Sequence, residues 1–92
     1  MKSDVKAVRV TGTGSVFAGR TRLRGIIMAS DGLGSAGSIT LQDGNSVTQF
    51  QGDCPSGDVF AFNIPEDGIL FEGGMTVSAI ANLSGATLLI DK

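Results

Sequence analysis

Few side chains in this sequence could support catalysis, and they are widely separated. Histidine, the commonest acid–base group and metal ligand, is absent from the 92 residues. The single cysteine, Cys54, excludes an internal disulfide and a thiolate metal site within one chain, and no histidine is present to activate it as a nucleophile. The adjacent Glu66 and Asp67 could form an acid–base pair, but they follow Pro65, and turns favour acidic residues for backbone reasons. We therefore predict a protein that is not an enzyme, uses no cofactor and holds no metal.

The most distinctive polar pattern is a row of alternating arginines. Arg20, Arg22 and Arg24 are separated by Thr21 and Leu23, so in a strand the three guanidinium groups project from one face. They could be solvated or paired within the chain, they could bind carboxylates of a neighbouring subunit, or they could contact nucleic-acid phosphates. No exposed aromatic residue is interleaved with them to stack on bases, so nucleic acid is the least favoured partner. The three arginines form the candidate interface.

Charge and composition support an assembling protein more than a nucleic-acid-binding one. The net charge is −2, but residues 1–24 sum to +5 and residues 25–92 to −7. This asymmetry is compatible with neutralisation inside the fold, with head-to-tail subunit contacts, or with an anionic partner. With 41% hydrophobic and 17% charged residues, the chain has little charge to keep it monomeric, so a homo-oligomer is expected and a trimer is possible.

The stretch Val59–Ile80 is the predicted centre of the core. Bulky residues fall on every second position before and after a Pro-Glu-Asp-Gly turn, which is the period of a strand with one buried face. A third strand pattern follows Gly73-Gly74. The predicted core residues are Phe60, Phe62, Ile64, Ile69, Phe71 and Val77.

The rest of the chain also reads as short strands between turns. Strand patterns cover Val5–Thr11, Ser15–Ala18, Arg20–Ala29, Ser38–Gln42, Val47–Gln51 and Thr87–Ile90, with loops predicted at Ser30–Gly37, Gly52–Asp58 and Asn82–Ala86. Gly25 is expected to form a bulge that re-aims its strand, and the apolar run from Ile26 is expected to be covered on both faces. About eight antiparallel strands and no helical pattern predict one all-β domain over residues 1–92, a β-sandwich for which a jelly-roll-like topology is a candidate.

Three motifs resemble small β-rich proteins of tailed bacteriophages, notably marine cyanophages. They are R-x-R-L-R-G-I at Arg20–Ile26, G-S-I-T-L-Q-D-G at Gly37–Gly44, and N-I-P-E-D-G-I-L-F-E-G-G-M-T-V at Asn63–Val77. Most such proteins have no known function. The resemblance implies a compact sandwich that works by assembly, as a capsid-decorating or tail-associated piece of the virion, and it transfers no catalytic residue.

The sequence thus predicts a non-enzymatic structural protein that forms a homo-oligomer or docks on other virion proteins. The alternative is a sandwich that binds host-surface glycan or another small ligand in its loops, although Trp and Tyr, the usual sugar-stacking residues, are absent. No apolar run reaches the ~18–20 residues of a membrane span, and the start Met1–Asp4 lacks an apolar signal core. The expected location is therefore the virion or the host cytoplasm, without secretion.

Overall fold

The computed structural model describes residues 5–64 and 68–91, and every regular element in these ranges is a strand. The predicted turn at residues 65–67, with Glu66 and Asp67, lies outside the described residues. The strands are β1 (Val5–Val10), β2 (Gly14–Phe17), β3 (Thr21–Ser30), β4 (Gly37–Asp43), β5 (Thr48–Cys54), β6 (Val59–Asn63), β7 (Ile69–Phe71), β8 (Met75–Ala81) and β9 (Leu83–Asp91). The all-β prediction is confirmed, with nine strands where about eight were expected.

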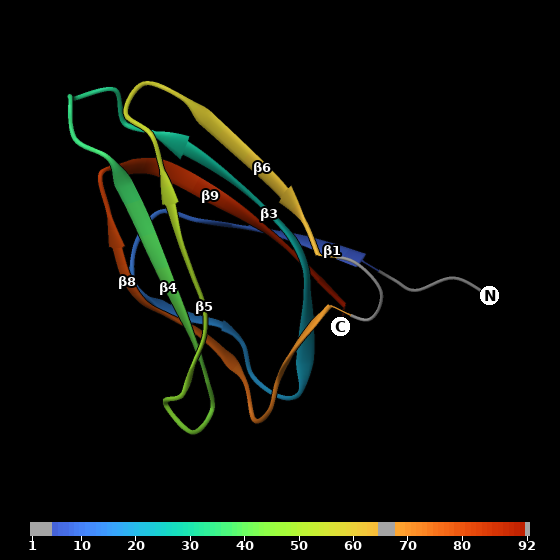
Figure 1. Ribbon diagram of the computed structural model, residues 1–92. Helices are drawn as coiled ribbons and strands as arrows, with labels where there is room; N and C mark the ends of the chain where they lie inside the picture. The colour runs from blue at the N-terminus through green and yellow to red at the C-terminus, as the bar shows by residue number, and fades with distance from the viewer. Residues whose placement is uncertain (1–4, 65–67, 92) are drawn as a thin grey trace.

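The strands pair as an antiparallel ribbon that has been folded in half and rolled up. β1 pairs with β9, β2 with β8, β3 with β6 and β4 with β5. Apart from the short β7, which pairs with β3, the first strand thus meets the last, the second meets the last but one, and so on. Rolling produces two sheets in the orders β1-β9-β3-β6 and β2-β8-β4-β5, which face each other in Figure 1. This is the pairing of a jelly-roll sandwich.

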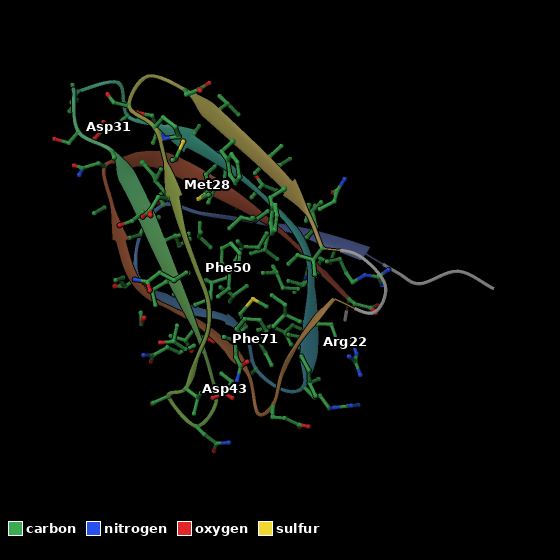
Figure 2. The ribbon with its side chains drawn as sticks, viewed as in Figure 1. Arg22, Met28, Asp31, Asp43, Phe50 and Phe71 are labelled. Atoms are coloured by element: carbon green, nitrogen blue, oxygen red, sulfur yellow. The ribbon has the colours of Figure 1, made fainter. Side chains whose placement is uncertain are left out.

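The core lies between the two sheets and is built by side chains that alternate along each strand. Figure 2 shows Met28 and Phe71 directed into the space between the sheets. The fully buried apolar side chains are Leu23, Ile26, Met28, Ile39, Leu41, Cys54, Phe71, Met75, Val77, Ala86, Leu88 and Ile90.

A bulge in β3 keeps this long strand facing the core along its whole length. Leu23 and Ile26 are both buried although three positions separate them, which simple alternation would not allow. The register with β9 shifts between Leu23 and Gly25, so an extra residue is accommodated there. The predicted bulge at Gly25 is confirmed. It leaves Arg22 and Arg24 outside while Ile26 and Met28 return to the core.

Two of the six predicted core residues are not in the core. Phe71 and Val77 are buried, and Ile64 and Ile69 pack partly buried against the central cluster. The prediction is wrong for Phe60 and Phe62, which are 40% and 42% exposed. These two side chains share a sheet face with the buried Ile26 and Met28, but β6 is the last strand of its sheet. Their face is therefore only partly covered by the opposite sheet.

The loops predicted at Gly52–Asp58 and Asn82–Ala86 are shorter than expected. β5 continues to Cys54, and β9 begins at Leu83, directly after a turn made by Asn82 alone, whose φ is 59°. Gly85, which suggested a turn, instead lies inside β9, where the Arg9 guanidinium occupies the space that a Cβ would need. The glycine there leaves room for the Arg9 side chain to lie across β9.

Asp43 organises the β4–β5 hairpin turn. Its Oδ1 accepts hydrogen bonds from the backbone N–H groups of Asn45 at 2.9 Å and Val47 at 3.1 Å, and its Oδ2 accepts one from Gln49 Nε2 at 3.1 Å. The backbone bonds, Val47 first, together with the weaker Gln49 bond, hold the pKa of Asp43 below its ordinary value of 3.8, against the opposing effect of desolvation. The turn is thus stabilised by an ionised carboxylate.

This arrangement predicts a pH-dependent contribution to stability. Because the folded-state pKa of Asp43 is lowered, its contribution is fully present above the unfolded value and is lost as pH falls through the folded pKa. We expect Asp43→Ala to lower the free energy of unfolding at pH 7 and this deficit to shrink below about pH 4. Urea titrations of both proteins between pH 3 and pH 7 measure the difference, and an unchanged deficit across that range would contradict the assignment.

The same turn packs against the β7–β8 turn through glycine backbones. The Gly44 N–H donates to Glu72 O at 2.8 Å, and a Cβ on Gly44 would lie 2.5–2.8 Å from backbone atoms of Gly73. We expect Gly44→Ala to lower the free energy of unfolding by about 1–3 kcal/mol, because backbone rather than a flexible side chain must move. Gly12→Ala, whose Cβ meets no atom within 4 Å, is the matched control and should change it by less than about 0.5 kcal/mol. Equal effects of the two substitutions would show that the contact is not strained.

Candidate assembly surface

The arginine row, Arg20, Arg22 and Arg24, lies on the outer side of β3 and just before it, and two of its members are paired within the chain. Arg20 Nε lies 3.6 Å from Glu72 Oε2, with both side chains mostly exposed. Arg24 Nη1 donates to Asp91 Oδ2 at 3.2 Å in a more buried setting. Arg22 forms no ion pair with a residue in the described ranges. Of the roles considered for the row, intrachain pairing is therefore the one observed for Arg20 and Arg24.

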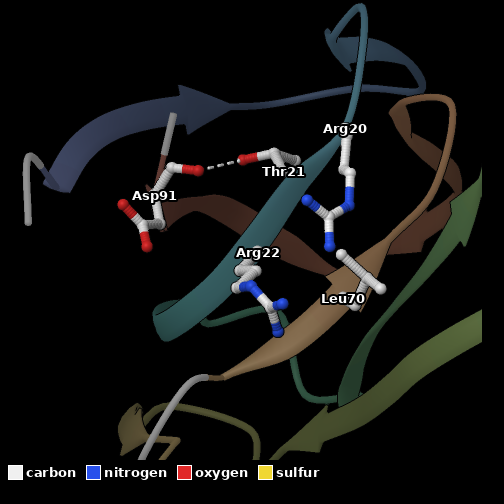
Figure 3. A pocket seen from close by; sticks show the side chains of 5 residues that line it. All are labelled: Arg20, Thr21, Arg22, Leu70 and Asp91. Atoms are coloured by element: carbon white, nitrogen blue, oxygen red, sulfur yellow. Dashed lines mark hydrogen bonds between the residues drawn. The ribbon is translucent and has the colours of Figure 1, made fainter.

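A small open cleft of about 240 Å³ lies beside this row. Arg20, Thr21, Arg22, Leu70 and Asp91 line it (Figure 3). Thr21 Oγ1 donates to the Asp91 backbone O at 2.7 Å and so ties the start of β3 to the end of β9. Asp91 offsets part of the positive charge, and the lining contains neither a nucleophile with a base nor an aromatic ring. This cleft can hold water or a small anion, but it offers no chemistry for a reaction or for base stacking.

A second hollow, of about 330 Å³, lies between β5 and β6 and is mostly apolar. Phe50 from β5 and Phe60 and Phe62 from β6 line it, and we call these three side chains the aromatic groove. The Phe62 ring centroid lies 6.2 Å from that of Phe50 and 6.0 Å from that of Phe60, within the range of favourable ring contacts. β5 and β6 are each the last strand of their sheet and lie at the same side of the sandwich (Figure 1). The groove lies between them.

The other face of β6 is also apolar. Because side chains alternate, Val59 and Ala61 point to the outer side of the sheet, as does Ile27 of β3, which pairs with Ala61. Ile27 is 41% and Val59 62% exposed, so the expectation that this run of β3 is covered on both faces is wrong. No described strand lies over this outer face.

These two faces concentrate exposed apolar surface on β3 and β6. Six large hydrophobic side chains are exposed among the described residues, and four of them, Ile27, Val59, Phe60 and Phe62, belong to these adjacent strands. We call these four residues the apolar edge. Single exposed hydrophobic residues are ordinary, but several of them gathered on two neighbouring strands make a candidate interaction surface.

Cys54 is buried at the end of β5. Its Sγ lies 3.4 Å from the Asp58 backbone O and 3.9 Å from that of Met28, distances compatible with a weak S–H donor. The thiol thus helps to close the residue 54–58 loop against the core. Burial removes it from redox reagents and partners in the folded state.

Residues 5–64 and 68–91 contain no group of three or more His, Cys, Asp or Glu side chains placed to hold a metal ion. Within the same ranges there is also no helix long and apolar enough to span a membrane. The absence of an enzyme activity, a cofactor and a membrane partner stays a prediction from the sequence.

Comparison of the chain with protein-family models, with curated proteins and with solved structures found no match. The resemblance to phage proteins is therefore carried by the sequence motifs alone.

Sequence reasoning singled out the arginine row and missed the aromatic groove. Phe60 and Phe62 alternate as core residues do, and Phe50 lies in a short strand with no distinguishing neighbours. The only local signal is that Val59–Asn63 carries no charged residue, which suits a buried strand and an interface strand equally well. Which of the two applies depends on the position of β6 in the sheet.

The two arginine pairs should differ in their contribution to stability. Arg24→Gln is expected to lower the free energy of unfolding by up to about 1 kcal/mol, and Arg20→Gln by less than about 0.5 kcal/mol, because the latter pair is longer and more exposed. Urea unfolding at low salt measures both, and a double-mutant cycle with Asp91→Asn isolates the Arg24 pair. Equal losses of unfolding free energy for Arg20→Gln and Arg24→Gln would show that the greater burial of the Arg24 pair does not make it more stabilising.

Proposed function

We propose that this protein is a non-enzymatic structural protein that acts by assembly, as a homo-oligomer that can dock on a larger particle such as a tailed-phage virion. The observation that carries the proposal is the apolar edge, in which Ile27, Val59, Phe60 and Phe62 stay exposed on two adjacent strands. The resemblance of three sequence motifs to small phage proteins is what supports the virion setting. The jelly-roll pairing is compatible with it, since this fold occurs in viral capsid proteins, but fold by itself does not assign function.

The energetics of the apolar edge favour self-association. Burying a Phe side chain completely contributes about 1.5–3 kcal/mol, so covering the exposed two-fifths of Phe60 and Phe62 contributes on the order of 2 kcal/mol per copy. Ile27 and Val59 add to this on the outer face. Few charges oppose close approach there, because Val59–Asn63 carries none. The arginine row supplies orientation rather than affinity in this proposal, with Arg22 the member left to meet a carboxylate of a neighbour.

A second candidate function is the binding of a small ligand, including a host-surface glycan, in the aromatic groove. The observation in its favour is the hollow of about 330 Å³, whose lining also includes Gln51 and Asp53 as polar groups. Phenylalanine rings can pack against an apolar sugar face, but the groove has no Trp or Tyr to add a hydrogen bond. Binding on a glycan array that Phe62→Ser abolishes would favour this function over assembly.

The assembly proposal predicts a concentration-dependent mass. We expect light scattering across a tenfold concentration range to give a multiple of the 9.4 kDa chain mass. The double variant Phe60→Ser, Phe62→Ser should shift the mass toward the monomer, because it removes the aromatic surface. Leu33→Ser, which changes a still more exposed apolar residue in the β3–β4 loop, is the control and should keep the wild-type mass. Circular dichroism checks that all three proteins are folded.

Repeating the light-scattering measurement at high salt shows whether the apolar edge or the arginine row holds the oligomer together. An oligomer held by the apolar edge should persist or tighten, whereas one held by the arginine row should dissociate. A wild-type protein that is monomeric at every concentration would overturn the proposal.

A further inference from the structure

We infer that two copies associate by pairing β6 with β6 around a two-fold axis, so that the β1-β9-β3-β6 sheet continues from one copy into the next. In this pairing Ala61 lies opposite Ala61 of the second copy. The inference rests on the proposed self-association and specifies the strand, the register and the partner. It is carried by the backbone groups that β6 leaves free, by the absence of charge along the strand, and by the placement of its two phenylalanines.

The backbone of β6 offers hydrogen-bonding groups on its free side. Ser30 N donates to Asp58 O and Ile64 N donates to Arg24 O, each at 3.0 Å. In residues 58–64 the backbone N–H and C=O groups of the even-numbered residues therefore point toward β3. In an antiparallel pair the backbone groups of successive residues point alternately toward and away from the partner strand. The N–H and C=O groups of Val59, Ala61 and Asn63 therefore point away from β3. β6 ends the strand order of its sheet, so no described strand meets these groups.

β6 also lacks the features that protect an edge strand from pairing. Charged residues, proline and bulges are the usual protection, and Val59–Asn63 contains no charged residue and no proline. The opposite edge of the same sheet, β1, carries Lys6 and Arg9. In the other sheet β5 carries Asp53, and β2 is four residues long with a register shift. Apart from the three-residue β7, which also pairs only with β3, β6 is therefore the least protected edge strand of the two sheets.

The register follows from the three residues that face outward. A two-fold axis at Ala61 pairs Ala61 with itself and Val59 with Asn63 of the second copy, and this register uses all three outward-facing residues. A shift of two residues in either direction loses one of these pairs. The Val59 N–H already donates to Asp58 Oδ1 at 2.8 Å. Two kinds of hydrogen bond across the axis remain without it, those between the two copies of Ala61 and those from the Asn63 N–H of one copy to the Val59 O of the other.

The side chains fit the same register. Between the hydrogen-bonded positions, Phe60 lies opposite Phe62 of the second copy, in the narrower type of cross-strand pair, where side chains approach most closely. Both rings are on the aromatic-groove face, and both are exposed in the single copy. The two-fold axis thus brings the aromatic grooves of the two copies side by side, and it brings no like charges together within Val59–Asn63. An aromatic, self-complementary strand is what an isologous interface requires.

Charge substitutions at Ala61 test this register directly. The Ala61 side chain is exposed on the outer face, so Ala61→Lys and Ala61→Glu should fold. Each variant alone places like charges opposite each other across the axis, and we expect the dissociation constant to rise about fivefold or more. An equimolar mixture should restore association as a Lys–Glu heterodimer. Native mass spectrometry distinguishes it from the homodimers by mass, and sedimentation gives the constants.

Ala7 supplies the matched control, because it is an exposed alanine on β1, the opposite edge of the same sheet. Ala7→Lys and Ala7→Glu should leave association unchanged. Oligomers that are indifferent to charge at Ala61 would overturn the β6 pairing and leave the assembly proposal standing. Variants that dissociate alone and do not recombine when mixed would overturn the self-opposed register. A wild-type monomer at all concentrations would overturn both the inference and the proposed function.

Discussion

The antiparallel pairing of β3 with β9 is the interaction on which the rest of the structure depends. β3 and β9 are the two central strands of their sheet, and β3 has β9 along one edge and β6 with β7 along the other. It joins residues near the start of the chain to residues at its end, as in Arg22 with Asp91 and Ala29 with Gly85. Once this pairing forms, β1 has β9 to pair with and β6 has β3. The loop-closure entropy of such distant pairs must be offset by the core they bury.

The bulge at Gly25 allows β3 to bury both Leu23 and Ile26 while its arginines stay on the outer face. Without it, the strand would carry either Leu23 or Ile26 on the outer face, and a large apolar side chain would leave the core. With it, the arginine row is outside and paired in part to Glu72 and Asp91, while the following residues return to the interior. The charge asymmetry between the first 24 residues and the remainder is thus neutralised in part across the sheet, by contacts between β3 and the later strands.

A rolled ribbon necessarily leaves strands at the open sides of its two sheets, and here those strands differ in chemistry. The β1 edge is charged, whereas β6 presents phenylalanines on one face and small or branched apolar side chains on the other. The exposed apolar surface on which the proposed assembly rests is therefore a consequence of topology as much as of composition. The same rings that would be ordinary core residues in a central strand stay partly exposed at an edge. The arginine cleft, by contrast, is small and partly neutralised by Asp91.

The sequence by itself determined the strand content, the turn at Asp43-Gly44, the bulge at Gly25 and the burial of Phe71 and Val77. These features depend on local alternation and on glycine or aspartate at particular positions, so a short stretch of sequence is enough to predict each of them. Only the tertiary structure decided that Phe60 and Phe62 are exposed, that Ile27 has no strand over it, and that Leu83–Ala86 belongs to a strand. Alternation states which side chains share a face, but whether that face is covered depends on pairing between distant segments. Which distant segments pair depends on the fold of the whole chain.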